Sequence, residues 1–442
     1  MKKIVKFLPI IFAIALSAFA VSACKEEPPA NPPAPVSQNL EFRQTEGGYL
    51  VSGLGECTDS EVWLPTEHEG QPVIGIAASA FYDEDGIEKL HLSSSIKTIG
   101  AFAFESCNHI TEISVNEENP HLKTVDGDIY SKDGKTFVLG AFWKGEALAE
   151  IESGVEKISP AAFYGCGLIE EVSLPKGLKE IGAHAFQNCV SLNKINLRSS
   201  TVQSIGAQAF KGCINIKTLT LPSGLSSLGE YAFSNCTRLR SVVFGTGLTS
   251  VPRGAFEGCT KLETVDLYTK IESIGESAFS SCYFLSSVRF SNVLEEIGAW
   301  AFLDCRTLAE LDFPQSLKTI GNYAFQGCDY LTSISLPALV ETVGNGAFFG
   351  CRDLAEVSFS ASLQKIGQYA FYGCKNIAEV ELPATLNEIG ENAFVGCTAL
   401  SRAKFIEPSG WSANEQSLTL TDEEMSADLL TEEYVSYTWN KA

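Results

Sequence analysis

The chain has 442 residues, with 54 Asp or Glu against 32 Lys or Arg, and its formal net charge is -22. Such an acidic protein repels polyanions, which excludes nucleic acid as a partner of the folded part. Hydrophobic residues make up 45% of the chain and charged residues 19%, so the chain can bury a core. The uneven use of Phe (27), Gly (37), Cys (14) and Met (2) indicates a repeated unit.

Residues 1–23 have the pattern of a signal peptide for export. Three Lys within the first six residues precede an apolar run from Phe7 to Val21. A transmembrane anchor is the weaker alternative, because the run is short for a membrane span and contains Pro9. The segment Val21-Ser22-Ala23-Cys24 resembles a bacterial lipoprotein processing box. This resemblance implies that Cys24 is acylated and becomes the mature N-terminus.

Residues 24–39 are predicted to form the acylated Cys and a Pro-rich tether. Five Pro lie between residues 25 and 39, and Val36 is the only large apolar side chain there. Such a segment cannot pack and extends by roughly 3 Å per residue, which would hold the folded part off the membrane. Residues 40–75 are predicted to form an N-terminal cap, with Cys57 in its core.

A 23-residue repeat accounts for most of the remaining chain. A Cys follows the pair Ala-Phe by three residues in unit after unit, and from Cys166 to Cys397 successive Cys are 23 residues apart except for one interval of 24. Most units read Leu-x-x-Ile-Gly before Ala-Phe and Leu-x-x-Val-x-Leu-Pro after the Cys. The Cys of these units are Cys107, Cys166, Cys189, Cys213, Cys236, Cys259, Cys282, Cys305, Cys328, Cys351, Cys374 and Cys397.

This period with Leu at fixed places predicts a β-rich solenoid of the leucine-rich repeat type. We expect a right-handed array of about 13 coils over residues 76–400, with short parallel strands at Val-x-Leu. The Gly after Ile is expected to allow a tight bend, and Ala-Phe-x-x-Cys to form one helical or 3₁₀ turn.

The interval between Cys107 and Cys166 is longer than two periods. Within it, Lys132-Asp133-Gly134 separates two β-type runs, and Asp-Gly at such a place predicts a hairpin. We therefore expect a β-hairpin insertion at about 116–150 that projects from the solenoid. Residues 401–442 leave the repeat and are predicted to form a C-terminal cap, with a short helix from Glu423 to Leu430.

The sequence lacks the motifs of common catalytic and metal sites. It contains no Gly-x-Ser-x-Gly, His-Glu-x-x-His or Cys-x-x-Cys, and its five His have no ligand spacing. We expect no catalytic residue, no metal and no cofactor, and hence no enzyme. The row of repeat Cys could in principle form disulfides or bind metal. Cys of adjacent parallel coils are too far apart for disulfides, so we favour a structural ladder of free, buried thiols.

One variable repeat position carries unexpected aromatic residues. From the unit of Cys189 onward, the residue directly before Ala-Phe is small or polar in most units, but it is Tyr231, Trp300, Tyr323 or Tyr369 in four of them. Trp300 and Tyr323 belong to consecutive units and should touch. These four are candidate ligand-binding residues, because exposed aromatic residues often mark interfaces. The alternative is that they stack only to shield the Cys ladder.

The repeat resembles that of BspA-like leucine-rich repeat proteins of bacterial surfaces, over roughly residues 70–400. The resemblance implies binding to protein ligands, often host matrix or cell-surface proteins, and supplies no catalytic residue. We expect a monomeric adhesion lipoprotein, anchored in the outer membrane and exposed at the cell surface. Two alternatives stay open, a periplasmic scaffold and a glycan-binding surface protein.

Overall fold

The computed structural model describes residues 35–441, and the chain divides into two units, Met1–Pro35 and Val36–Ala442. The predicted signal peptide, Cys24 and most of the tether lie outside the described residues. The helices and strands of residues 35–441 all belong to the second unit. No helix among them combines the length and the apolar character needed to cross a membrane.

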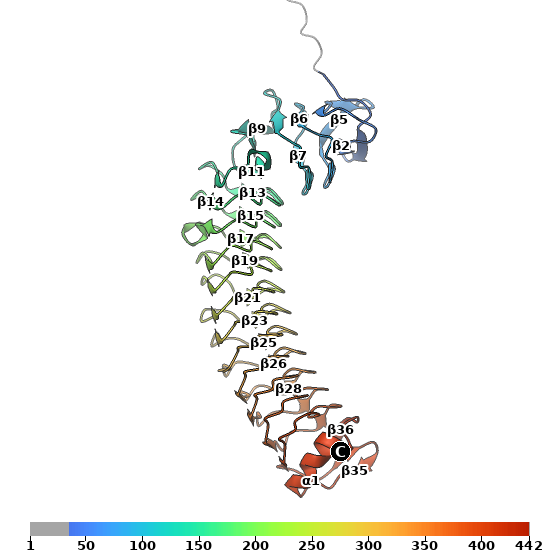
Figure 1. The fold of residues 1–442 in the computed structure, drawn as a ribbon, viewed down its shortest axis with the longest axis vertical. Helices are drawn as coiled ribbons and strands as arrows, with labels where there is room; N and C mark the ends of the chain where they lie inside the picture. Colours follow the sequence, from blue (N-terminus) through green and yellow to red (C-terminus); the bar gives the residue numbers. More distant parts are fainter. Residues whose placement is uncertain (1–34, 442) are drawn as a thin grey trace, which may run out of the picture. The chain divides into compact units, whose positions relative to one another are not determined.

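Each regular coil contributes a two-residue strand at the Ile that precedes Gly, and these strands pair in parallel from coil to coil (Figure 1). The sequence did not predict these strands, since a strand of two residues leaves no alternating pattern. They belong to two sheets, because β19 and β21 do not pair. The first contains β13 (Lys157–Ile158), β15 (Glu180–Ile181), β17 (Ser204–Ile205) and β19 (Ser227–Leu228), and the second contains β21 (Ser250–Val251), β23 (Ser273–Ile274), β25 (Glu296–Ile297), β26 (Thr319–Ile320), β28 (Thr342–Val343), β30 (Lys365–Ile366) and β32 (Glu388–Ile389).

A second set of parallel strands follows the Cys, where the Val-x-Leu pattern predicts it. Their central side chains point into the core, as with Val265 and Val242. These strands are β12 (Leu148–Glu150), β14 (Glu171–Ser173), β16 (Lys194–Ile195), β18 (Thr218–Thr220), β20 (Ser241–Val243), β22 (Thr264–Asp266), β24 (Ser287–Arg289), β27 (Ser333–Ser335), β29 (Glu356–Ser358), β31 (Glu379–Leu382) and β33 (Arg402–Phe405). One 3₁₀ turn, η2 (Leu197–Ser199), follows β16.

The Ala-Phe-x-x-Cys segment is a run of hydrogen-bonded turns, so the expected helical or 3₁₀ turn is wrong. The reason is a left-handed backbone at two of its residues, as at Trp300 (φ 54°) and Asp304 (φ 58°). Alternate amides bond within the segment, as from Cys305 to the Phe302 carbonyl. The other amides bond to the next coil, as from Phe302 to the Ala324 carbonyl. This alternation ties each turn segment to its neighbour.

The Gly after Ile serves close packing of coils, not the expected tight bend. A Cβ at Gly321 would lie 2.6 Å from the Ala299 amide nitrogen of the preceding coil. The backbone of Gly321 does not have the positive φ that only Gly adopts readily. Any side chain here would push two coils apart.

The core of the array is a stack of Phe rings. From Phe163 to Phe394, rings of successive coils lie nearly parallel with centroids 4.9 to 5.6 Å apart. These rings are almost completely buried. Burial of one Phe contributes roughly 1.5–3 kcal/mol before chain entropy is subtracted, so stability grows coil by coil.

The N-terminal part combines a small sheet with the first coils. The hairpin of β1 (Glu41–Thr45) and β2 (Gly48–Gly53) is joined by β5 (Gln71–Ile76), which pairs with β4 (Glu67–His68) and β7 (Thr98–Ile99). A second sheet contains β3 (Glu61–Trp63), β6 (Lys89–Leu92) and β8 (Glu112–Val115). Cys57, expected in the core here, is only half-buried.

The hairpin around Lys132–Gly134 is present, but it does not project from the array. The strands β9 (Leu122–Val125), β10 (Asp128–Ser131) and β11 (Thr136–Leu139) form an antiparallel meander, and β11 pairs in parallel with β13. Tyr130 and Phe137 are buried, so these strands must stay in contact with the core. After β11 the chain forms a short 3₁₀ turn, η1 (Phe142–Lys144).

The C-terminal segment covers the last coil, near the lower end of Figure 1. Strand β36 (Trp439–Lys441) pairs antiparallel with β32, and β34 (Trp411–Ala413) and β35 (Gln416–Ser417) continue the sheet. Helix α1 (Glu423–Asp428) begins after Asp422, whose side chain accepts a hydrogen bond from the Met425 amide. A π-helical turn, η3 (Leu429–Glu433), follows it.

Candidate functional site

Three of the four aromatic residues before Ala-Phe contact the same position of the next coil. The rings of Trp300 and Tyr323 stack with centroids 6.0 Å apart and an interplanar angle of 4°, as expected for consecutive coils. The Tyr323 ring lies over Gly346, where a Cβ would be 2.2 Å from it. Tyr231 covers Gly254 in the same way. In these two pairs of coils the ring leaves room only for Gly at the same position of the next coil, whereas Trp300 is followed there by Tyr323 and Tyr369 by Asn392.

The structure brings together only some of the four predicted residues. Trp300 is 37% exposed, whereas Tyr323 and Tyr369 are half-buried. Tyr369 is separated from Tyr323 by the coil of Gly346, and it contacts Tyr372 at a centroid distance of 5.9 Å.

Tyr231 stands apart from the other three, because the coils of Gly254 and Ser277 separate it from Trp300. Its ring faces the Lys211 ammonium at 5.9 Å. The structure also adds two residues that sequence reasoning missed. Phe349 and Tyr372 follow the core Phe directly in neighbouring coils, and their rings stack at 4.8 Å. Trp300 with Tyr323, and Phe349 with Tyr372 and Tyr369, are thus two groups of contacting rings on four successive coils, and we call these five residues the aromatic row.

A second group of exposed rings lies after the Cys, where basic side chains cover them. The Lys261 ammonium lies 3.8 Å from the Phe284 ring centroid, and the Arg306 guanidinium lies 4.7 Å from that of Tyr283. Arg289 covers Tyr268 at 4.0 Å. Cations therefore already occupy one face of each of these rings, although Tyr268 and Phe284 are 55% and 49% exposed, more than any ring of the aromatic row.

The repeat Cys are buried free thiols, and most of them share one hydrogen bond. The Cys305 thiol donates to the Phe279 carbonyl of the preceding coil at 3.3 Å, and the pattern recurs along the array. The same carbonyl accepts the Cys282 amide of its own coil. The thiol thus satisfies a second lone pair inside the core, a role that spacing alone could not reveal.

Burial suppresses the chemistry of these thiols. It raises the pKa of Cys107 to about 11 and that of Cys166 and Cys397 to about 12, and it raises the pKa of other ladder thiols, such as Cys305, well above the ordinary value. Only a thiolate is a good nucleophile or metal ligand. Within residues 35–441 no cluster of three or more His, Cys, Asp or Glu side chains has the arrangement of a metal site.

The described geometry defines a class: a leucine-rich repeat solenoid with aromatic residues on its surface. The chain belongs to the BspA type leucine-rich repeat family, whose model matches residues 70–132, 147–221, 203–332 and 318–417. No curated protein sequence matches the chain.

Several solved structures are similar to the chain. A leucine-rich repeat protein from Bacteroides ovatus is 24% identical, with a TM-score of 0.47, over 84% of this chain and 100% of that one. A leucine rich cell surface protein from Faecalibacterium prausnitzii is 20% identical, with a TM-score of 0.42, over 85% and 95%. The pneumococcal vaccine antigen PcpA is 22% identical, with a TM-score of 0.45, over 54% of this chain and 60% of that one.

Proposed function

We propose that this chain is a non-catalytic cell-surface lipoprotein that binds protein ligands through the aromatic row. Its role would be adhesion to host matrix proteins or to proteins of partner cells. Membership of the BspA type family supports a binding protein over an enzyme. The protonated thiol ladder also argues against nucleophilic or metal chemistry in the array.

The observation that carries the proposal is the exposed stack of Trp300 on Tyr323. Large rigid rings dominate the binding energy of protein interfaces, because they bury much apolar area at a small entropy cost. The Phe349–Tyr372 stack enlarges this apolar surface on the following coils. The net charge of -22 further favours protein ligands over polyanions.

The test replaces Trp300, Tyr323 and Tyr369 together by Ser in the full-length protein. Loss of one hot-spot ring commonly costs about 2 kcal/mol, so capture of a ligand from a panel of matrix proteins should weaken by at least roughly 30-fold. Because Tyr323 packs on Gly346, we also expect a loss of stability on the order of 1 kcal/mol per stacked ring.

The matched control is the triple change Tyr268→Ser, Phe284→Ser and Tyr330→Ser, which removes three rings of 49–58% exposure elsewhere on the surface. Capture should be unchanged in this control. Undiminished capture by the aromatic-row variant would contradict the proposed site. Binding to a glycan array in place of the protein panel would instead support the glycan-binding alternative.

The proposed anchor is the acylated Cys24. Cys24→Ser should abolish labelling by a lipid precursor and release the protein from membranes, because residue 24 then has no thiol to which a lipid can be attached. Protease added to intact cells should remove the wild-type protein if it is exposed at the surface. Labelling that persists in the variant would refute acylation, and full protection from protease would favour the periplasmic scaffold.

A further inference from the structure

Every regular coil uses the same three backbone amides to bind the coil that follows. The amides of Trp300, Phe302 and Asp304 donate to the next turn segment at 2.9, 2.8 and 2.7 Å. The three equivalent hydrogen bonds are all present in the coil whose first donor is Ser79. They are also all present in every coil whose first donor lies between Ala161 and Tyr369. These bonds form a ladder of alternate residues, as at a strand edge.

One coil inside the array breaks this ladder. The amides of Phe102, Phe104 and Ser106 have no hydrogen-bond partner within residues 35–441. On the facing edge, the Pro160 and Tyr164 carbonyls accept no backbone amide from that part of the chain. Three amide donors and the Pro160 carbonyl are therefore left open between consecutive turn segments, and the Tyr164 carbonyl accepts only the Cys166 thiol at 4.0 Å.

A degenerate repeat at residues 136–145 causes the break. Phe137, Ala141 and Phe142 stand where a regular unit has Ile, Ala and Phe, but Gly145 replaces the Cys. The Gly140 amide donates to the Ala162 carbonyl, and the chain then leaves the ladder in the 3₁₀ turn η1. Among the described residues, no turn segment fills the place between Ser106 and Pro160.

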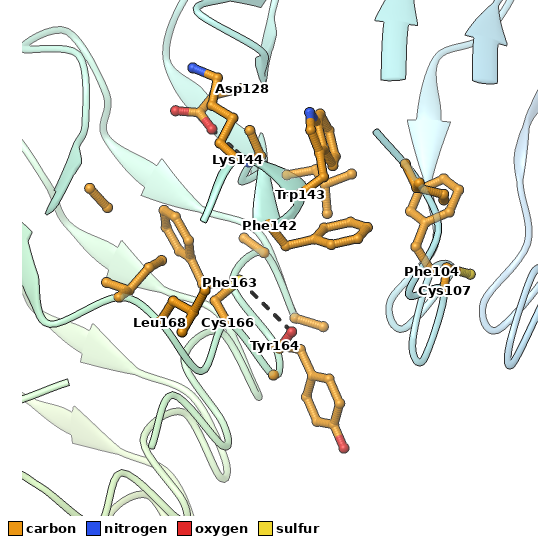
Figure 2. Close-up of a pocket in the computed structure, with 18 of the residues that line it drawn as sticks. Phe104, Cys107, Asp128, Phe142, Trp143, Lys144, Phe163, Tyr164, Cys166 and Leu168 are labelled. Carbon is orange, nitrogen blue, oxygen red and sulfur yellow. Dashed lines mark hydrogen bonds between the residues drawn. The ribbon is translucent and has the colours of Figure 1, made fainter. Parts of the chain in front are cut away.

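The vacated place is a cavity of ≈ 1500 Å³. Figure 2 shows Phe104 and Cys107 on one side of it and Phe163, Tyr164 and Cys166 on another. Phe142 and Trp143 reach into it, and both are only half-buried. Apolar walls and open backbone groups thus meet in one cavity, although Phe137 already stacks on Phe163 at 4.6 Å.

The charged lining of the cavity is mostly acidic. Five carboxylates line it against a single Lys, Lys144; they are Glu105, Asp126, Asp128, Glu146 and Glu150. Such a lining favours an occupant that carries positive charge.

We propose that this cavity docks an extended segment of a partner protein in which a large aromatic residue is flanked by basic residues. The backbone carbonyls of the segment accept hydrogen bonds from Phe102, Phe104 and Ser106, and its aromatic side chain packs against Phe104, because the Phe163 ring already stacks on Phe137. This is strand addition at an open edge, with the missing turn segment supplied by the partner. The site is separate from the aromatic row, so it can fail or succeed independently of the proposed function.

The test measures amide hydrogen exchange in the full chain by mass spectrometry, with a synthetic peptide as probe. The probe is Lys-Gly-Ala-Trp-Ala-Phe-Leu-Lys, in which the repeat segment 298–303 is flanked by lysines. In the free protein, amides of 101–107 should exchange much faster than those of 299–305, because the alternate amides are hydrogen-bonded to a following coil only in the latter. The probe at about 1 mM should slow exchange of 101–107 at least tenfold and leave 299–305 unchanged.

Two matched comparisons test whether opposite charge of probe and cavity determines binding. A probe with Glu in place of both flanking Lys should give no protection. The double change Glu146→Lys and Glu150→Lys should weaken the original probe roughly tenfold, whereas Glu341→Lys with Glu356→Lys, a pair outside the cavity lining, should have no effect.

Three results would overturn the proposal. They are slow exchange of 101–107 in the free monomer, no protection by the probe at about 1 mM, and equal protection by the acidic probe. Protection that appears with rising protein concentration alone would identify a second copy of this chain as the occupant, and would likewise overturn docking of a basic partner segment.

Discussion

Two residues in each turn segment adopt a left-handed backbone, and the residue types found at the two positions differ. The residue before Cys is Gly, Asn, Ser or Asp in the regular coils, types that tolerate this backbone, as at Gly350 (φ 71°) and Asp304 (φ 58°). The residue before Ala-Phe instead includes Trp300 and Tyr323, for which the left-handed backbone is costly. Stacking on the next coil offsets this cost.

Substitutions at Gly350 and Gly346 distinguish the energetic cost of a left-handed backbone from the cost of a clash with the Tyr323 ring. No atom lies within 4 Å of the place that a Cβ would take at Gly350, so Gly350→Ala should cost only the left-handed penalty, about 1 kcal/mol. Gly346→Ala should cost about 1–3 kcal/mol more, because its Cβ would meet the Tyr323 ring at 2.2 Å. Urea unfolding of both variants measures the difference.

A double-mutant cycle provides the control for this prediction. In a Tyr323→Ser background, the extra cost of Gly346→Ala should disappear, since the ring that it meets is gone. Equal costs for Gly346→Ala and Gly350→Ala in the wild-type background would contradict packing of Tyr323 on Gly346.

At the scale of elements, the C-terminal segment closes the open edge of the last coil. Strand β36 pairs Trp439 with Ile389 of β32, and the Trp439 indole N–H donates to the Tyr434 carbonyl at 3.2 Å. An uncovered β32 would present unpaired backbone groups and invite association with another chain. The cap therefore serves both stability and solubility.

Trp439 is the residue on which this closure depends most. It is 2% exposed, and Trp439→Ala should lower the free energy of unfolding by about 3–5 kcal/mol and promote aggregation. Denaturant unfolding and light scattering measure the two effects. Tyr437→Ala, two residues earlier and 41% exposed, is the matched control and should change stability by no more than about 0.5 kcal/mol. Similar costs for both variants would show that the segment does not cap the core.

At the scale of the molecule, the ladder of protonated thiols links stability to pH. An unfolded thiol ionises near pH ~8.5, whereas burial raises the pKa of the folded ladder thiols to about 11 or higher. Above about pH 8.5 the thiols of the unfolded state lose their protons while those of the folded state keep them, so the unfolded state binds fewer protons than the folded state. Stability is fully present below the unfolded pKa and falls as pH rises toward the folded pKa.

We accordingly predict steep alkaline unfolding. Each ladder thiol should remove about 1.4 kcal/mol of stability per pH unit above roughly pH 9, and the thiols act together because the coils are stacked. Urea midpoints measured between about pH 8 and about pH 10.5 test this. A variant with Cys305→Ala and Cys328→Ala should show a shallower slope, and an unchanged midpoint in the wild type over this range would contradict thiol linkage.

The period of 23 residues was sufficient to predict the solenoid, the buried Phe and Cys, and the contact of Trp300 with Tyr323. Each of these depends only on the regular spacing of residues along the chain, which stacking converts into proximity. The hairpin at Lys132–Gly134 could be predicted for a similar reason, since Asp-Gly specifies the turn from the local sequence alone.

Other features depend on neighbours that are distant in sequence. Tyr323 lies over Gly346, and the Cys305 thiol bonds to the Phe279 carbonyl, because coils approach closely enough for side chain and backbone of different units to meet. The open amides of Phe102, Phe104 and Ser106 arise from a departure of the chain far along the sequence, after Gly140. Repeat spacing therefore determined which residues enter the core, whereas tertiary packing decided which backbone groups and rings remain free to bind, because that depends on whether the next coil covers them.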